Sequence, residues 1–112
     1  MANINLFNAL GDPTRRLLFE RIRQGPSTVT DLVAAVTVSQ PAVSQHLKVL
    51  REAQLVRVTK QGQQRIYQLN PQGLEELRRY MDDLWDDALR AFADEAEKLA
   101  NAAENSDIEA GT

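Results

Sequence analysis

The fold of this chain is decided by residues 38–56, which read VSQPAVSQHLKVLREAQLV. This stretch predicts one short helix over about residues 39–53. Ser39 is a good N-cap because its hydroxyl can accept a hydrogen bond from an otherwise unpaired helical N–H. Pro41 then falls in the first turn, where its missing N–H costs little. One side of the helix is apolar and predicts a core contact through Val43, Leu47 and Leu50.

The opposite side of this predicted helix is polar. It carries short polar side chains, an amide and one ammonium, and no acid comes before Glu52. This mixture suits the base edges and phosphates of a DNA groove, although any solvated helix face can also carry it. The residues on that side are Pro41, Ser44, Gln45 and Lys48.

The segments on either side favour the DNA interpretation. A second short helix is expected before it, over about residues 28–36, with a tight link at residues 37–38. Two short helices joined in this way match a helix-turn-helix, whose second helix enters the major groove. Residues 55–69 follow directly and predict a β-hairpin, the wing of a winged helix, with Gly62 in the turn. Cationic side chains flank the tip of this wing at Lys60 and Arg65.

Three further helices complete the prediction. The first spans residues 3–10, and the second begins at a cap formed by Asp12 and Pro13. The last and longest runs over about residues 71–101. The expected core stripe of the second helix consists of Leu17, Leu18 and Ile22.

The resulting fold class is mainly α with a small β-hairpin, a winged helix-turn-helix in the order α-α-α-α-β-β-α. We expect residues 1–101 to form one DNA-binding domain with dimerisation helices at both ends, and residues 102–112 to be a disordered tail. A helix of about 45 Å exceeds what a domain of this size can cover, so a second copy of the chain is its expected partner. The alternative is that this helix wraps back on its own domain. The expected dimerisation residues are Ile4, Phe7, Met81, Leu84, Trp85, Ala88 and Phe92.

The charge of the chain is divided unevenly. The 112 residues carry a net charge of −3, which taken alone argues against a nucleic-acid partner. Residues 1–69 hold nine Lys and Arg against four acids, a net charge of +5, and residues 70–112 hold four against twelve, a net charge of −8. Because salt screens charges beyond about 8–10 Å, the local field decides, and the basic part is the one with the helix-turn-helix pattern.

The composition excludes most catalytic and metal chemistry. With no cysteine, disulfides, thiolate metal sites and thiol catalysis are excluded together, and with one histidine per chain a histidine-based metal site could form only across a dimer. We therefore expect a protein that is not an enzyme and has no cofactor. No apolar run could span a membrane and no signal peptide is visible, so the expected location is cytoplasmic.

One histidine and one cluster of four carboxylates each have both a site interpretation and a simpler one. His46 lies at the edge of the apolar side of helix 39–53, where we expect a packed or phosphate-contacting residue rather than a metal ligand. Four carboxylates share a helical segment, and such a set favours hard cations, but a solvated acidic face is the simpler interpretation. The four carboxylates are Asp82, Asp83, Asp86 and Asp87, and the sequence leaves open whether they bind a cation.

Several short motifs together resemble one known family. They are LGDPTR at 10–15, VSQHLK at 43–48, VLREA at 49–53, LV at 55–56, QG at 61–62 and YQL at 67–69. With them, the chain resembles the ArsR/SmtB family of bacterial transcriptional repressors over about residues 4–92. The resemblance implies a homodimer built from the first and last helices, a recognition helix at about 39–53, and repression that an inducer relieves.

One departure from the family pattern concerns metal. Metal-sensing members often carry a Cys-x-Cys-Asp-Leu segment before the recognition helix, and the matching residues 28–32 read TVTDL. Threonines therefore stand at both thiolate positions, Thr28 and Thr30. The resemblance supports DNA binding and dimerisation, and it argues against thiolate-based metal sensing.

The function that we expect is a homodimeric, metal-independent repressor that binds a near-palindromic double-stranded DNA operator and answers to an unknown small-molecule or protein inducer. The alternative is a winged-helix module that mediates protein contacts, or a small-molecule-binding dimer that does not bind DNA. A protein-contact module would more often show aromatic or leucine side chains on the outer face of helix 39–53. The expected DNA-binding residues are Ser39, Gln40, Pro41, Ser44, Gln45, His46, Lys48, Lys60 and Arg65.

Overall fold

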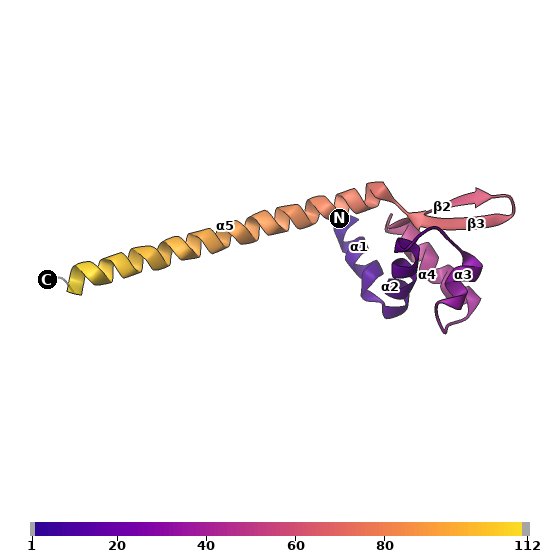
Figure 1. Cartoon of the computed structure of the whole chain (residues 1–112), viewed down its shortest axis with the longest axis horizontal. Coiled ribbons are helices and arrows are strands. Elements are labelled where there is room, and N and C mark those ends of the chain that lie inside the picture. The colour runs from indigo at the N-terminus through magenta and orange to yellow at the C-terminus, as the bar shows by residue number, and fades with distance from the viewer. Residues whose placement is uncertain (1, 111–112) are drawn as a thin grey trace. The chain divides into compact units, whose positions relative to one another are not determined.

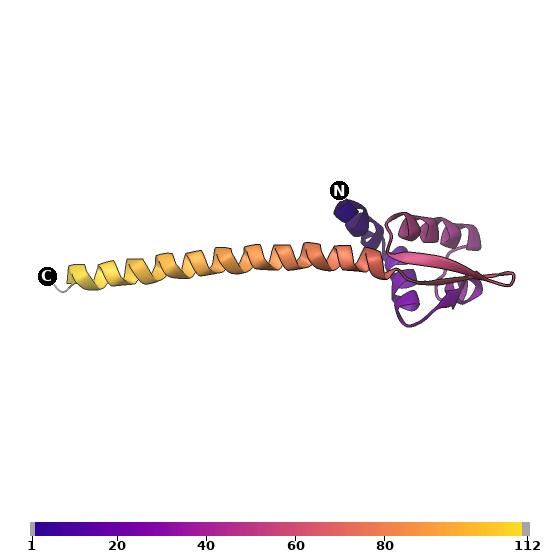
Figure 2. The same ribbon diagram turned by 90° about the horizontal axis from the view of Figure 1, so that it is seen from above.

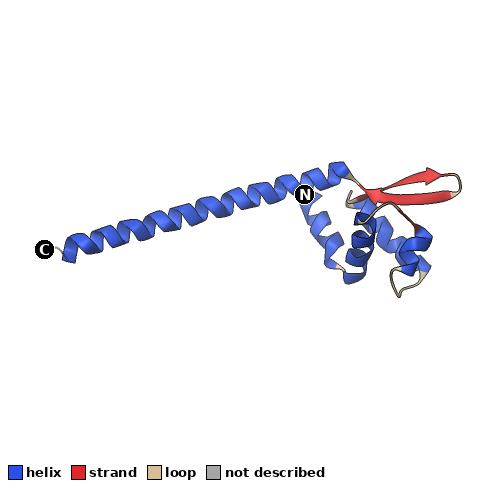
Figure 3. Ribbon diagram, in the orientation of Figure 1, coloured by secondary structure: helices blue, strands red, loops and turns tan. Residues whose placement is uncertain are grey.

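The computed structural model of the chain describes residues 2–110, and the side chains of residues 5–104. Helices dominate it, and a small three-stranded antiparallel sheet accompanies them (Figures 1 and 3). The predicted fold class is confirmed, with one strand more than the hairpin that we expected. In chain order the elements are α1 (Ala2–Gly11), α2 (Pro13–Arg23), β1 (Ser27–Thr28), α3 (Val29–Ala34), α4 (Gln40–Glu52), β2 (Val56–Gln61), β3 (Gln64–Leu69) and α5 (Pro71–Ala110).

The chain divides into two compact units. The first extends to Arg78 and holds α1 to α4, the sheet and the beginning of α5. The second begins at Arg79 and is helical up to Ala110. None of the helices within residues 2–110 is both long and apolar enough to cross a membrane.

The core of the first unit lies where α1, α2 and α4 pack together beside the sheet. The predicted apolar side of α4 is confirmed, because Val43, Leu47 and Leu50 are all buried. The prediction for Leu17 is wrong, since 58% of this residue is exposed. Leu18 and Ile22 stand four residues apart on one face of α2, and Leu17 is rotated by about 100° away from it. The buried apolar residues are Leu6, Ala9, Leu18, Ile22, Leu32, Val43, Leu47, Leu50, Ala53, Leu55, Val56 and Tyr67.

The helix-turn-helix consists of α3 and α4. Thr28 caps α3 in a capping box with Asp31, whose backbone N–H donates to Thr28 Oγ1 at 3.1 Å while its carboxylate accepts from the Thr28 N–H at 3.0 Å. Ser39 caps α4 as predicted and accepts from the Ala42 N–H at 3.3 Å. The link is longer than we expected and covers residues 35–39, because the N–H groups of Ala35 and Val36 bond three residues back and close α3 early.

The sheet has the strand order β1-β3-β2, and both pairings are antiparallel. Strands β2 and β3 form the predicted wing, and Gly62 takes a φ of +62° in its turn. The sequence did not predict β1, in which Ser27 and Thr28 pair with Tyr67 and Ile66. Figures 1 and 2 both show the tip of the hairpin projecting beyond the helices of the first unit.

Helix α5 is longer than the sequence predicted. It continues to Ala110, beyond the expected end near residue 101. Extending an existing helix needs no new nucleus, and Ala102, Ala103 and Glu104 are good helix formers, so the helix continues without an apolar stripe that requires it. Residues 111–112 lie outside the described part.

The described side chains among the expected dimerisation residues of α1 and α5 are exposed. Leu74 and Leu77 at the start of α5 pack against the core of the first unit. From residue 81 onward the described side chains of α5 are all exposed. The side chain of Ile4 lies outside the described residues. Exposed fractions are 46% for Phe7, 48% for Met81, 50% for Leu84, 65% for Trp85 and 75% for Phe92, and Ala88 is exposed as well.

Candidate nucleic-acid interface

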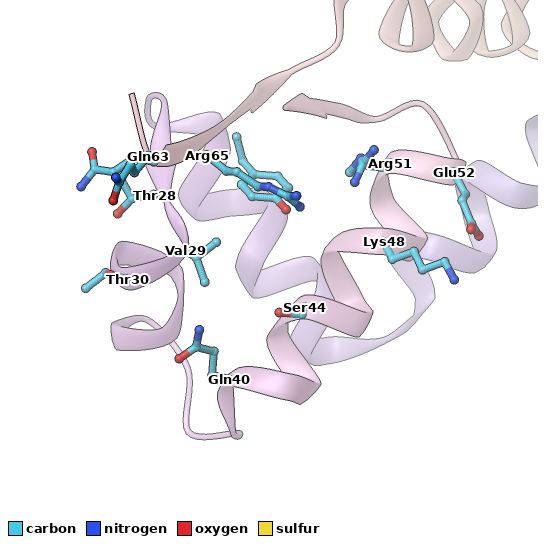
Figure 4. A pocket seen from close by; sticks show the side chains of 12 residues that line it. Thr28, Val29, Thr30, Gln40, Ser44, Lys48, Arg51, Glu52, Gln63 and Arg65 are labelled. Carbon is cyan, nitrogen blue, oxygen red and sulfur yellow. The ribbon is translucent and has the colours of Figure 1, made fainter. Parts of the chain in front are cut away.

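A hollow of about 680 Å³ separates helix α4 from the wing (Figure 4). We call it the reading hollow. Its walls come from the outer face of α4, the start of α3 and the tip of the hairpin, so the helix-turn-helix and the wing share one concave surface. The residues that line it are Thr28, Val29, Thr30, Gln40, Ser44, Lys48, Arg51, Glu52, Gln63, Gln64, Arg65 and Tyr67.

Helix α4 places a row of polar side chains along this hollow. Gln40, Ser44, Lys48 and Arg51 recur at spacings of four, four and three residues and therefore share one helical face. All four are exposed. In Figure 4, Gln40 and Ser44 lie on the side of α4 that is nearest to α3. The order along the helix is amide, hydroxyl, ammonium, guanidinium, so uncharged groups at its N-terminal end give way to cations.

The wing places two cationic side chains next to each other on neighbouring strands. Lys60 and Arg65 are directly opposite each other in the β2–β3 register, so their side chains leave the same face of the hairpin. Like charges in this arrangement repel each other. An anion that contacts both would remove the repulsion, and a nucleic-acid phosphate is such an anion.

The predicted DNA-binding residues take different positions around this surface. Gln40, Ser44, Lys48 and Arg65 line the hollow, whereas Ser39, Pro41, Gln45 and Lys60 are exposed beside it. The hydroxyl of Ser39 is already engaged as the N-cap. His46 is half-buried and lies next to α2. Its Nδ1 is 3.4 Å from Arg15 Nη1 and 4.0 Å from Asp12 Oδ2.

Asp12 is the N-cap of α2 and faces the same histidine. Its carboxylate accepts from the Arg15 backbone N–H at 2.9 Å. This hydrogen bond, together with the positive charge of the Arg15 side chain, holds the pKa of Asp12 below its usual value. The carboxylate therefore stays charged at neutral pH beside α4.

Comparison with known proteins agrees with this architecture. Residues 12–58 match the model of the "Bacterial regulatory protein, arsR family". The HTH-type transcriptional regulator Rv2034 of Mycobacterium tuberculosis is 48% identical over 87 residues, which cover 78% of this chain and 81% of that protein. This chain belongs to the ArsR family. It is a transcriptional regulator and not an enzyme.

Two further similar proteins cover comparable parts of the chain. The transcriptional repressor SdpR of Bacillus subtilis is 32% identical over 77 residues, 69% of this chain and 86% of that protein. The structure of an ArsR-like transcriptional regulator from Rhodococcus sp. RHA1 superimposes with a TM-score of 0.69 at 26% identity, covering 81% of this chain and 89% of that one.

In this ArsR-family chain, the two threonines at the thiolate positions, Thr28 and Thr30, lie at the start of α3. Thr28 is the N-cap of α3, and the hydrogen bond that the Asp31 carboxylate accepts from the Thr28 backbone N–H keeps the pKa of that carboxyl below its usual value. Thr30 lines the reading hollow. Among residues 5–104, no three His, Asp or Glu side chains gather into a group that could hold a metal, and the segment with Asp82, Asp83, Asp86 and Asp87 is included in that statement.

Sequence reasoning missed several residues of the interface. Arg51 stands seven residues after Ser44, so the helical period could have placed it on the same face of α4. Gln63 lies in the turn of the hairpin next to Gly62, so the predicted tip of the wing could have included it. The start of α3 could not be found in this way, because Thr28 reaches the hollow through the pairing of β1 with β3.

Proposed function

We propose that this ArsR-family regulator is a homodimeric repressor that binds a near-palindromic operator through α4 and the wing. The observation that supports this most directly is the reading hollow, which is lined by Lys48 and Arg51 of α4 together with Arg65 of the wing. Regulators of this family bind DNA operators and usually act as dimers. The cytoplasm is the compartment that fits this function, since bacterial operators lie there.

The residues of the interface divide into two roles. Gln40, Ser44 and Gln45 belong to the first turns of α4, the part of a recognition helix that reaches base edges, and a glutamine can pair bidentately with adenine. Lys48, Lys60 and Arg65 suit phosphates, which fix the position of a protein on DNA without reading its sequence. In a symmetric dimer, two such helices would read half-sites about one helical turn (~10–10.5 bp) or a multiple apart.

The apolar pattern of α5 supports a second copy as the partner. Apolar residues recur along it with a period of eleven: Leu74, Leu77 and Met81, then Trp85, Ala88 and Phe92, then Ala96, Leu99 and Ala103. Eleven residues in three turns correspond to about 3.67 residues per turn, close to the value of a straight helix, so the stripe stays on one face. The first two residues of the pattern are partly buried in the core, and the remaining seven are exposed. A helix of the same kind is the surface that such a stripe fits.

We further propose that operator binding does not depend on metal. Support comes from Thr28 and Thr30 at the thiolate positions and from the single histidine, which lies against Arg15. Operator affinity should be the same with a chelator and with added zinc. A shift of tenfold or more, about 1.4 kcal/mol, would contradict this.

The decisive experiment is a gel shift with the DNA upstream of the gene that encodes this protein, followed by nuclease footprinting. We expect a protected near-palindrome and competition by unlabelled operator but not by a scrambled duplex. Equal competition by both duplexes would show that the protein does not select a sequence. A complete lack of binding would favour the protein-contact or small-molecule alternative.

A further inference from the structure

The guanidinium of Arg15 connects α1 with α4. Its Nε donates to Ala9 O at 2.9 Å and its Nη2 donates to Asn8 O at 3.2 Å, and both carbonyls belong to the last turn of α1. Its Nη1 lies 3.4 Å from His46 Nδ1 on α4. Arg15 itself belongs to α2. The side chain of Arg15 therefore connects three helices of the first unit: α1, α2 and α4.

The chemistry of these groups determines the direction of each contact. Carbonyls in the last turn of a helix have no partner within the helix and need a donor from elsewhere. A guanidinium can only donate, so His46 Nδ1 must act as the acceptor, which places the ring proton of the neutral imidazole on Nε2. Asp12 Oδ2 lies 4.0 Å from the same Nδ1, and its negative charge attracts the Arg15 guanidinium.

The contact between α1 and α4 combines apolar packing with hydrogen bonds. Ala9 and Ala53 are buried in the core, and an open hollow of about 180 Å³ lies at the surface beside them, lined also by Asn5, Asn8, Arg15, Val49 and Glu52. Beside this hollow, the Arg15 side chain makes hydrogen bonds that reach both helices.

We propose that Arg15 is a positioning residue that couples α1 to the orientation of the recognition helix through His46. His46 directly follows Gln45 and stands two residues after Ser44, so a displacement of His46 turns the face of α4 that meets DNA. The inference rests on the proposed function, in which α4 reads the operator and α1 belongs to the dimer surface. It assigns to His46 a role in holding α4, which corresponds to the packed residue and not to the phosphate contact among the two roles that the sequence suggested.

A neighbouring residue provides a matched control. Arg16 donates its Nε to Leu10 O at 3.1 Å, so it also bonds the end of α1. Among the hydrogen bonds of the described side chains, it is Arg15 and not Arg16 that reaches α4. Arg15→Gln and Arg16→Gln each remove one positive charge and contacts to α1, but Arg15→Gln alone breaks the connection to His46.

The test is a double-mutant cycle on DNA binding with Arg15→Gln, His46→Ala and the double variant. Each protein is titrated on the footprinted operator duplex and on a scrambled duplex at several salt concentrations. We expect each single variant to lose about tenfold in operator affinity, the size of one hydrogen bond to a charged group, while binding to scrambled DNA changes much less. The double variant should lose about tenfold as well, because both changes break one connection.

Three further measurements separate positioning from a merely structural or phosphate-binding role. His46→Asn keeps an acceptor near the position of Nδ1 and should restore most of the operator affinity. Arg16→Gln should bind the operator like the wild type. The slope of log K against log salt should not change in Arg15→Gln, since a lost phosphate contact would flatten it by about one.

Several results would overturn the proposal. They are a hundredfold loss in the double variant, equal losses on both duplexes, an equal loss in Arg16→Gln, or a flatter salt slope. If Arg15→Gln does not fold, the comparison of His46→Ala with His46→Asn tests the same connection from α4. A wild type without operator preference would overturn the proposed function together with this inference, whereas a selective wild type with an equally selective Arg15→Gln overturns the inference alone.

Discussion

At the scale of single residues, Gly73 is the glycine of the described residues that has the least space for a side chain. A Cβ added there would lie 1.7 Å from Gln54 O and 2.6 Å from Gln54 C, and both are backbone atoms that cannot move aside cheaply. Gln54 itself takes a φ of +62° in the turn between α4 and β2. The first turn of α5 therefore packs against the end of the recognition helix through a glycine.

We expect Gly73→Ala to lower the free energy of unfolding by about 2–3 kcal/mol, as overpacking and a backbone shift combine. Urea unfolding at neutral pH measures it. Gly11→Ala is the control, because an added Cβ at Gly11 meets nothing within 4 Å, and its unfolding midpoint should stay at or slightly above that of the wild type. Equal midpoints for the two variants would contradict the close approach at residue 73.

Two capping carboxylates give the stability of the protein a defined pH dependence. Backbone hydrogen bonds, from Arg15 and Thr28 respectively, lower the pKa of Asp12 and of Asp31 in the folded state. A carboxyl whose pKa is lower when folded contributes its stabilisation fully above the unfolded pKa of about 4 and loses it as the pH falls toward the folded pKa. Stability should therefore decline below about pH 4–5.

The variant Asp12→Asn/Asp31→Asn tests this assignment, because neither asparagine titrates. Urea midpoints measured between pH 7 and pH 3 should fall less steeply with decreasing pH in this variant than in the wild type. Parallel curves for the two proteins would show that other groups cause the acid sensitivity.

At the scale of elements, α4 and the wing should make separable contributions to DNA binding. Gln45→Ala removes an expected base contact and should weaken operator binding by about 1–3 kcal/mol, with relaxed base preference and an almost unchanged salt slope. Arg65→Ala removes a phosphate contact and should weaken binding to all sequences while flattening the salt slope by about one. Salt titrations on operator and scrambled duplexes measure both effects.

The two assignments can fail independently. An equal loss on both duplexes for Gln45→Ala would remove α4 from base reading, at least at this position. An unchanged salt slope for Arg65→Ala would show that Arg65, which is paired with Lys60 in the wing, does not contact a phosphate.

At the scale of the whole molecule, the exposed stripe of α5 predicts a dimer. Leu84→Glu/Ala88→Glu adds one negative charge within the stripe and one at its edge, one turn before Ala88, and should yield a monomer or an unfolded chain, since apolar burial cannot offset two unpaired carboxylates. Light scattering at micromolar concentration distinguishes the states. Lys98→Glu changes the net charge by the same two units outside the stripe and should remain dimeric. A monomeric wild type would refute the dimer directly.

What the sequence determined by itself is the part of the fold that local rules govern. The caps Asp12 and Ser39 and the apolar period of α4 were predictable, because capping and helical periodicity depend on residues within a few positions. The wing followed from alternation and Gly62. The polar face of α4 could be proposed as the DNA side, because its charge and side-chain types suit a DNA groove.

Only the tertiary structure decided which segments meet across the chain. It placed β1 against β3 and thereby brought Thr28 to the reading hollow, and it turned Leu17 away from the core. It also set Gly73 against Gln54 and Arg15 between α1 and His46. These contacts join residues that are distant in sequence, and no local pattern records them, because their geometry depends on how the elements pack rather than on how each one forms.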